Sequence, residues 1–249
     1  MNISIVEKST GNGLDASALK LIAIFGMTLD HVGIVFGGML PLWAETALFA
    51  LGGLTFPIMA YLLVEGYKHT SNLKKYAFRL FIFALISSLP FRWALRLPGL
   101  NVLFTLLLGL ATLYLYDHMK NRPAFWAAFA GMSVFSVVMD WGLIGVPMVL
   151  LYRVLRGKRQ RVVIPALLPI GLALVQFGVR CIMPSMSGID DLPSVAYAVI
   201  GCGLTIPLLA NYNQQRGKSL KYLFYVYYPA HLLVLALLRG LLFHDWAVS

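Results

Sequence analysis

Residues 19–40 read LKLIAIFGMTLDHVGIVFGGML, a long apolar stretch with Asp30 and His31 in its interior. About 20 mostly apolar residues cross the hydrocarbon core of a bilayer as a helix, so this stretch predicts a membrane span. The whole chain has the same character, since 59% of its 249 residues are hydrophobic, 12% are charged and the mean hydropathy is +0.79. An average soluble domain carries about 45–50% apolar and about 25% charged residues. The composition therefore excludes an ordinary soluble enzyme and predicts an all-α, multi-pass membrane protein.

Further apolar stretches follow along the chain, which predicts a transmembrane helical bundle of about nine spans. We place them at 19–40, 45–66, 74–91, 100–118, 123–139, 141–156, 162–182, 192–211 and 220–242. The fifth and sixth are short, and only Asp140 separates them. Residues 1–18 are mixed polar and predict a short cytoplasmic tail without a cleavable signal peptide. Residues 19–249 then form a single integral membrane domain.

The basic residues predict the orientation of the chain. There are 20 Lys and Arg against 10 Asp and Glu, a formal net charge of +10. With the N-terminus inside, most basic residues fall in inner segments, and the outer segments keep only Arg92, Arg96, Arg180 and Arg239. Because Lys and Arg are enriched on the cytoplasmic side, this predicts a cytoplasmic N-terminus and an outer C-terminus. Orientation thus accounts for the positive charge, so the expected surroundings are the lipid bilayer, and no nucleic-acid partner is expected.

Asp30 and His31 are ionisable side chains, which are unfavourable in the hydrocarbon core of a bilayer. They lie about 16 Å of helical rise beyond Lys20, near the middle of the membrane. A charged side chain there costs at least ~2.5–3.5 kcal/mol on insertion scales, so it marks a functional site by default. A carboxylate beside an imidazole suits proton transfer, with Asp30 orienting the ring or stabilising its charged form. The competing interpretation is a polar pair that ties the first helix to a neighbour.

A second histidine, His231, lies at a similar depth in the last span. It follows Tyr228 and Pro229, and the proline should kink the helix and free a backbone carbonyl. Two interpretations stay open. Tyr228 and His231 belong to a functional site, or His231 is a packed core histidine beyond an interfacial aromatic belt.

A polar group is predicted at the inner ends of the second and third spans. Glu65 and His69 are about one helical turn apart, and Arg79 lies at a similar depth on the following antiparallel helix, which predicts a Glu65–Arg79 ion pair. These residues could instead line a cytoplasm-facing pocket, where Lys75 and its neighbours attract a phosphorylated donor. No metal site is predicted, since the two cysteines of the chain have no metal-ligand spacing.

Four blocks of the chain resemble the TraX family. They are LKLIAIFGMTLDHVGIVF (19–36), TFPIMAYLLVEGYKHTSNLKKYAFRLFIFALISSLPF (55–91), LNVLFTLLLGL (100–110) and FYVYYPAHLLVLALLR (224–239). The string FPIMAYLLVEGYKHT, with the Asp-His pair upstream, is the most specific part. The family is named for a conjugation protein that N-acetylates the N-terminus of F-type pilin. Its members resemble the transmembrane acyltransferases, which include heparan-α-glucosaminide N-acetyltransferase.

The resemblance implies an N-acetyltransferase of the bacterial cytoplasmic (inner) membrane. Such an enzyme moves an acetyl group from acetyl-CoA, its donor substrate, to an outer acceptor such as a pilin-like envelope protein or a glycan. It implies catalysis by His31 with Asp30, and Glu65, Tyr228 and His231 fall in its other characteristic blocks. One departure is visible, because this chain has Gly52-Gly53 where many members have Gly-Arg. A basic residue that contacts the donor would then be missing, and Arg79 or Lys75 could substitute.

Two other classes of protein compete with this interpretation. A proton-coupled transporter uses the same kinds of intramembrane residue, although many transporters show internal repeats and this chain shows none. A non-catalytic membrane protein for pilus or secretion assembly would leave Asp30 and His31 unexplained. The resemblance favours the acetyltransferase. The identity of the acceptor, the use of an acetyl-histidine intermediate and the oligomeric state stay open.

Overall fold

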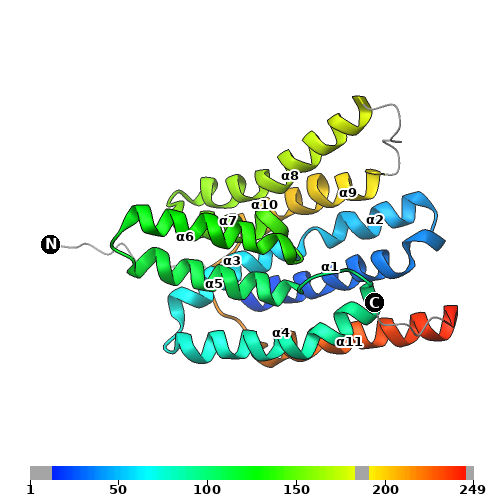
Figure 1. Ribbon diagram of the computed structural model, residues 1–249, viewed down its shortest axis with the longest axis horizontal. Helices are drawn as coiled ribbons and strands as arrows, with labels where there is room; N and C mark the ends of the chain where they lie inside the picture. The colour runs from blue at the N-terminus through cyan, green and yellow to red at the C-terminus, as the bar shows by residue number, and fades with distance from the viewer. Residues whose placement is uncertain (1–12, 183–190, 245–249) are drawn as a thin grey trace.

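The computed structural model describes residues 13–182 and 191–244, and every regular element in these ranges is a helix (Figure 1). This confirms the predicted all-α class. Six helical segments in the described part of the chain are long and apolar enough to cross a membrane. The structure therefore supports a helical membrane protein.

The six long segments contain most of the helices. They are α1 (Ala16–Phe36) with the 3-10 turn η1 (Gly37–Met39), α2 (Leu42–Gly52) with α3 (Thr55–His69), α4 (Leu73–Leu95), α8 (Lys158–Ile182), α9 (Leu192–Ala196) with the π-helical η4 (Tyr197–Cys202) and α10 (Gly203–Ala210), and α11 (Lys221–Phe243). Three shorter apolar segments are α5 (Val102–His118), α6 (Arg122–Phe135) with η2 (Ser136–Val138), and α7 (Gly142–Val154). Each predicted span falls on one of these segments, but length supports six of them as spans. The count of about nine stays a prediction.

Short polar side chains set the beginnings of four helices. The Asp15 carboxylate accepts a hydrogen bond from the Ala18 N–H of α1 at 2.8 Å. The side-chain oxygens of Asn72, Asn101 and Asn121 accept in the same way at the starts of α4, α5 and α6. These caps satisfy N–H groups that the first helical turn leaves without a partner. They explain why the apolar stretches begin as separate helices at these positions.

The α2–α3 segment lies at the centre of the bundle. In its most apolar stretch 67% of the residues are buried, against 22% to 44% in the other five long segments. Helices α1, α5 and α7 pack against α3, whereas α4 packs against α11 (Figure 1). The first and last helices, α1 and α11, also contact each other. Residues far apart in the sequence therefore meet inside the bundle.

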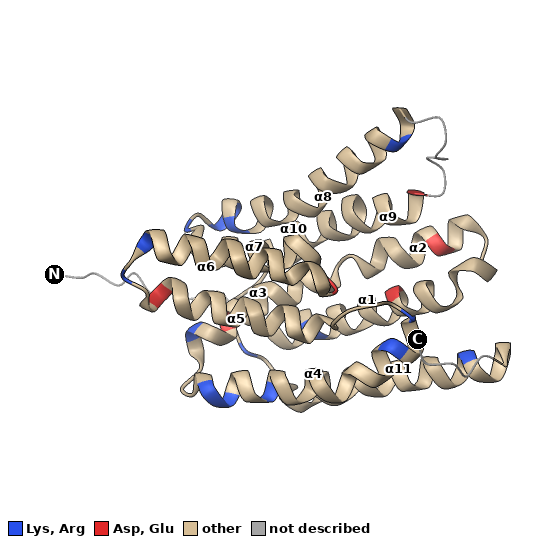
Figure 2. Cartoon of the chain, in the orientation of Figure 1, with Lys and Arg blue, Asp and Glu red and all other residues tan. Residues whose placement is uncertain are grey.

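Lys and Arg residues gather at one end of the bundle, where α4, α6 and α8 begin (Figure 2). Few basic residues lie at the opposite end of the described part of the bundle, where α4 and α8 finish. The charged end is the one that the sequence assigns to the inner side of the membrane. The fold therefore keeps the charge asymmetry on which the predicted orientation depends.

Two glycines allow the junction of α2 and α3 to lie directly against η4. A Cβ atom at Gly53 would overlap the backbone carbonyl of Tyr197, and one at Gly201 would lie 2.6 Å from the carbonyl oxygen of Ala50. Position 53 therefore has no room for a side chain of any size. The arginine that the sequence resemblance leads one to expect there is replaced by a backbone-to-backbone contact.

We expect Gly53→Ala to lower the free energy of unfolding by about 1–3 kcal/mol, because the added methyl group forces the two backbones apart. The measurement is thermal unfolding in a single detergent. Gly203→Ala is the matched control, since no atom lies within 4 Å of the position of its Cβ. Equal unfolding temperatures for the two variants would contradict the close contact.

Candidate active site

His31 and His231 meet in the interior of the bundle. His31 lies on α1 and His231 on α11, and their side chains are joined by a hydrogen bond of 2.7 Å between His31 Nδ1 and His231 Nε2. The two ring planes are 3° apart, and the residues are only 5% and 7% exposed. The contact between the first and last helices thus places two imidazoles, 200 residues apart, in one polar pair.

The backbone determines which ring nitrogen of each histidine carries the proton. His231 Nδ1 lies 2.8 Å from the carbonyl oxygen of Tyr227. A carbonyl only accepts, so His231 Nδ1 is the donor, and Nε2 of the neutral ring accepts from His31 Nδ1–H. This assignment, inferred from the hydrogen-bond network, leaves His31 Nε2 with a free lone pair. This nitrogen of His31 is therefore the one that could accept a proton.

A second contact fixes α11 against α1 next to the histidines. The Thr28 hydroxyl donates to the carbonyl oxygen of Ile24 at 2.8 Å. It therefore accepts from the Tyr227 hydroxyl, 2.7 Å away. Tyr228 is fully buried, and its ring centroid lies 6.2 Å from that of His31 and 5.7 Å from that of His231. Of the predicted site residues, His31, Tyr228 and His231 are thus brought together.

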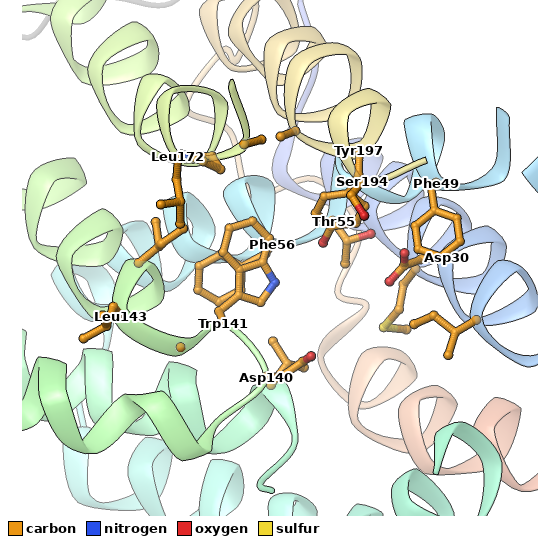
Figure 3. Close-up of a pocket in the computed structure, with 18 of the residues that line it drawn as sticks. Asp30, Phe49, Thr55, Phe56, Asp140, Trp141, Leu143, Leu172, Ser194 and Tyr197 are labelled. Carbon is orange, nitrogen blue, oxygen red and sulfur yellow. The ribbon is translucent and has the colours of Figure 1, made fainter. Parts of the chain in front are cut away.

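A cavity of about 530 Å³ lies beside His31, and Asp30 lines it with His31. Its wall includes the stacked rings of Phe56 and Trp141, whose centroids are 4.1 Å apart (Figure 3). The cavity is formed by the first residues of α3, α5 and α7 together with the later turns of α1 and α8. It therefore lies toward the end of the bundle that is poor in basic residues.

Asp30 shares the cavity with His31 but is not its hydrogen-bond partner. The helix is regular at this point, so adjacent side chains point in different directions. The Asp30 carboxylate packs against Gly52, where a Cβ atom would lie 2.8 Å from Oδ1, and Oδ1 has no hydrogen-bond partner among the described residues. His231 holds the position that the sequence analysis gave to Asp30 as the group orienting His31.

Glu65 does not pair with Arg79, so the predicted ion pair is wrong. Its carboxylate instead contacts Arg161 Nη2 at 2.6 Å and Lys68 Nζ at 3.1 Å. The reason is the packing of α3, which contacts α1, α5 and α7, whereas α4 packs on α11 and carries Arg79 away. The guanidinium of Arg79 lies over the Tyr76 ring of its own helix, 5.8 Å from the centroid.

Arg161 is the residue that the sequence analysis missed at this end of the bundle. Besides binding Glu65, it donates from Nε to the carbonyl oxygen of Tyr152 at 2.7 Å and lies 4.5 Å from the ring centroid of Tyr61. It comes from the basic run at the start of α8, which the sequence predicts to be an orientation signal or a surface that attracts a phosphorylated donor. Its side chain is only 16% exposed, which separates it from its neighbours in the run.

We expect Arg161→Ala to lower the free energy of unfolding by about 1–3 kcal/mol, because it leaves the half-buried Glu65 carboxylate without its closest partner. Thermal unfolding in detergent measures the effect. Arg159→Ala removes an exposed charge from the same basic run and is expected to leave stability unchanged. If Arg161→Ala unfolds at the same temperature as Arg159→Ala, the Glu65 contact contributes nothing.

The other predicted donor-binding residues lie away from the cavity. The His69 side chain is 78% exposed at the end of α3, 3.9 Å from Glu65. Lys75 and Arg79 border a surface hollow at the start of α4 with Lys74 and Phe78. Residues Phe56 and Glu65 are separated by about 14 Å of helical rise along α3, so these groups form a region distinct from the cavity. Their role toward a donor stays a prediction.

Part of the cavity wall was not predicted from the sequence, namely Asp140, Trp141 and Tyr197. Asp140 carried a usable signal, since it is an acidic residue set between two apolar stretches. Trp141 and Tyr197 carried none, because aromatic residues are common in membrane helices. Among the described His, Cys, Asp and Glu residues, no group of three or more could hold a metal ion.

These features define a helical membrane protein with a polar site in its apolar interior. A family profile described as TraX protein matches residues 15–239. The probable fimbrial assembly protein FimC, serogroup H1, of Dichelobacter nodosus is 30% identical over 242 residues, which cover 89% of this chain and 95% of the relative. No solved structure matches. The chain belongs to the TraX family.

Proposed function

We propose that the chain is a membrane-embedded acetyltransferase that moves an acetyl group from cytoplasmic acetyl-CoA to an amine or hydroxyl on the outer side of the membrane. The observation that carries the proposal is the hydrogen-bond chain from Tyr227 through His231 to His31. It leaves the lone pair of His31 Nε2 available beside the cavity. Acyl transfer to an amine or hydroxyl requires such a base.

The proposed reaction is a direct transfer. His31 Nε2 removes a proton from the acceptor as its nitrogen or oxygen attacks the thioester carbonyl carbon. The new bond to the acetyl group forms, the carbon–sulfur bond breaks, and the coenzyme A thiolate takes the proton from His31. His231 stays neutral and accepts the His31 Nδ1–H throughout, which holds the ring in the productive tautomer.

The proposed topology brings the two substrates from opposite sides. We place the N-terminus and the basic end of the bundle in the cytoplasm of a bacterium, in its inner membrane, with about nine spans in total. The donor then enters from the end that carries Lys75, Arg79, Glu65 and His69. The acceptor reaches the cavity from the other end, where its lining residues lie. His31 is about 16 Å of helical rise from Lys20, so only an extended part of the donor needs to reach it.

The proposed acceptor is a pilin-like envelope protein, which the name of the Dichelobacter nodosus relative supports. The same name favours a second candidate function, a non-catalytic role in fimbrial assembly. The two candidate functions differ in whether they need His31, since an assembly protein does not require a base beside a cavity. Mass spectrometry of both envelope proteins and glycans distinguishes a glycan acceptor from a protein acceptor.

The test compares envelope proteins and glycans from cells with and without the protein by mass spectrometry. We expect an acetyl group to disappear from one envelope component when the protein is absent, and to return with the wild-type protein but not with His31→Ala. Full assembly of fimbriae with His31→Ala, and no change in any acetyl group, would favour the non-catalytic role.

A further inference from the structure

A second carboxylate, Asp140, faces the same cavity as Asp30. It lies in the short turn between η2 and α7. Two backbone hydrogen bonds fix this turn, one from the Met139 N–H to the carbonyl oxygen of Ser136 and one from the Asp140 N–H to the carbonyl oxygen of Leu100. Figure 3 shows Asp30 and Asp140 approaching the same space from different elements, with Trp141 and Phe56 beside them. Neither carboxylate has a role in orienting the histidine pair.

Neither carboxylate forms an ion pair with any residue that the structure describes. Three other acidic side chains are each paired with an arginine. Glu65 binds Arg161, Asp117 binds Arg153 and Asp191 binds Arg180. Asp30 Oδ1 is in addition fully buried without a hydrogen-bond partner. A buried carboxylate oxygen without a partner is costly, so a cation bound in the cavity would remove that cost at Asp30, whereas the side chain of Asp140 is exposed.

The aromatic wall favours an organic cation. The rings of Phe56 and Trp141 are stacked, 15° from parallel, and the Tyr197 ring centroid lies 6.1 Å from that of Trp141. An ammonium group gains from contact with aromatic faces, most of all with tryptophan. A cavity lined by two carboxylates and a tryptophan is suited to a primary ammonium attached to an apolar body.

We propose that Asp140, together with Asp30, binds the acceptor as a protonated primary amine against Trp141, which makes Asp140 a determinant of specificity for amines over hydroxyls. The transfer step rests on the proposed acetyltransferase function, but the binding of the ammonium does not. Asp30 and His31 line the same cavity, so an ammonium held by Asp30 shares that cavity with His31.

The protons balance along this route. His31 Nε2 takes one proton from the bound ammonium and frees the nitrogen lone pair. The neutral amine attacks the thioester carbonyl carbon, the carbon–nitrogen bond forms and the carbon–sulfur bond breaks. His31 passes the first proton to water, takes the second proton from nitrogen as the amide forms, and gives that proton to the leaving thiolate. A hydroxyl acceptor has no charge for the two carboxylates to bind, so it gains nothing from them.

Binding of 2-phenylethylammonium and of its uncharged analogue 2-phenylethanol tests the proposal without any acetyl-CoA. The full-length protein in lipid nanodiscs is titrated with each probe by calorimetry. We expect the ammonium to bind about tenfold or more tightly than the alcohol, and Asp140→Asn to remove about tenfold of ammonium affinity while leaving the alcohol unchanged. Glu45→Gln is the control, because Glu45 lies on α2 at the same end of the bundle but outside the cavity lining.

Equal affinities of wild-type protein for the two probes would overturn the proposal, as would wild-type affinity of Asp140→Asn for the ammonium. If Asp140→Asn does not fold, the comparison of the two probes on wild-type protein decides, and Asp140→Glu, which keeps the charge, is expected to keep the selectivity. Selective ammonium binding by a protein that transfers no acetyl group would refute the proposed function and leave this site standing.

Discussion

Replacing His31 with alanine is expected to reduce acetyl transfer by about 10²–10⁴-fold, the usual range for losing a general base. His31 Nε2 is the ring nitrogen left free beside the cavity, because Nδ1 is bound to His231. The measurement is the rate at which purified protein in lipid nanodiscs moves labelled acetyl from acetyl-CoA to an amine acceptor. The same preparation is checked for insertion and thermal stability.

Two further variants separate the chemistry from the fold. His31→Asn keeps a side-chain N–H that can donate to His231 Nε2 but has no basic nitrogen, so it should fold well and still be inactive. His118→Ala removes an exposed histidine at the end of α5, where its ring stacks on that of Tyr114, and should keep full activity. Wild-type activity of a folded His31→Asn protein would exclude His31 as the base.

The sequence predicted those parts of the molecule that depend on local pattern. Apolar length predicted the helical segments, and the cost of burying charge singled out Asp30 and His31. The similar depths of His31 and His231 were also visible, because depth follows from counting residues along each helix. The direct bond between them was not, since it depends on α1 packing against α11. Depth is a property of one helix, whereas a contact is a property of two.

The error at Glu65 has the same physical origin. Arg79 lies on the next helix along the chain, and consecutive helices are usually neighbours in space. Here α4 packs on α11, and Arg161, 96 residues from Glu65, takes the place beside it. The tight contact of Gly53 with the backbone of Tyr197 was equally hidden, because a glycine in the sequence does not show which segment approaches it.

The second large effect that we expect is a loss of activity in His231→Ala. His231→Ala removes the acceptor of the His31 Nδ1–H, so the neutral His31 ring can move its proton to Nε2 and lose its basic site toward the cavity. Loss of the correct tautomer is costly in other histidine-dependent enzymes, and we expect kcat to fall by about 10²-fold or more. The Michaelis constant for acetyl-CoA should change little, because His231 lines neither the cavity nor the hollow at Lys75 and Arg79.

A conservative variant distinguishes this positioning role from a purely structural one. The side-chain oxygen of His231→Gln can stand in for Nε2 as an acceptor, so this variant should recover most of the activity that His231→Ala loses. Its bond to His31 Nδ1–H keeps the lone pair on His31 Nε2. Nitrogen NMR of labelled histidine should then report the same His31 tautomer in His231→Gln as in the wild type, and a mixture in His231→Ala. A single unchanged tautomer in His231→Ala would show that the Tyr227–His231–His31 chain does not set the protonation of the base.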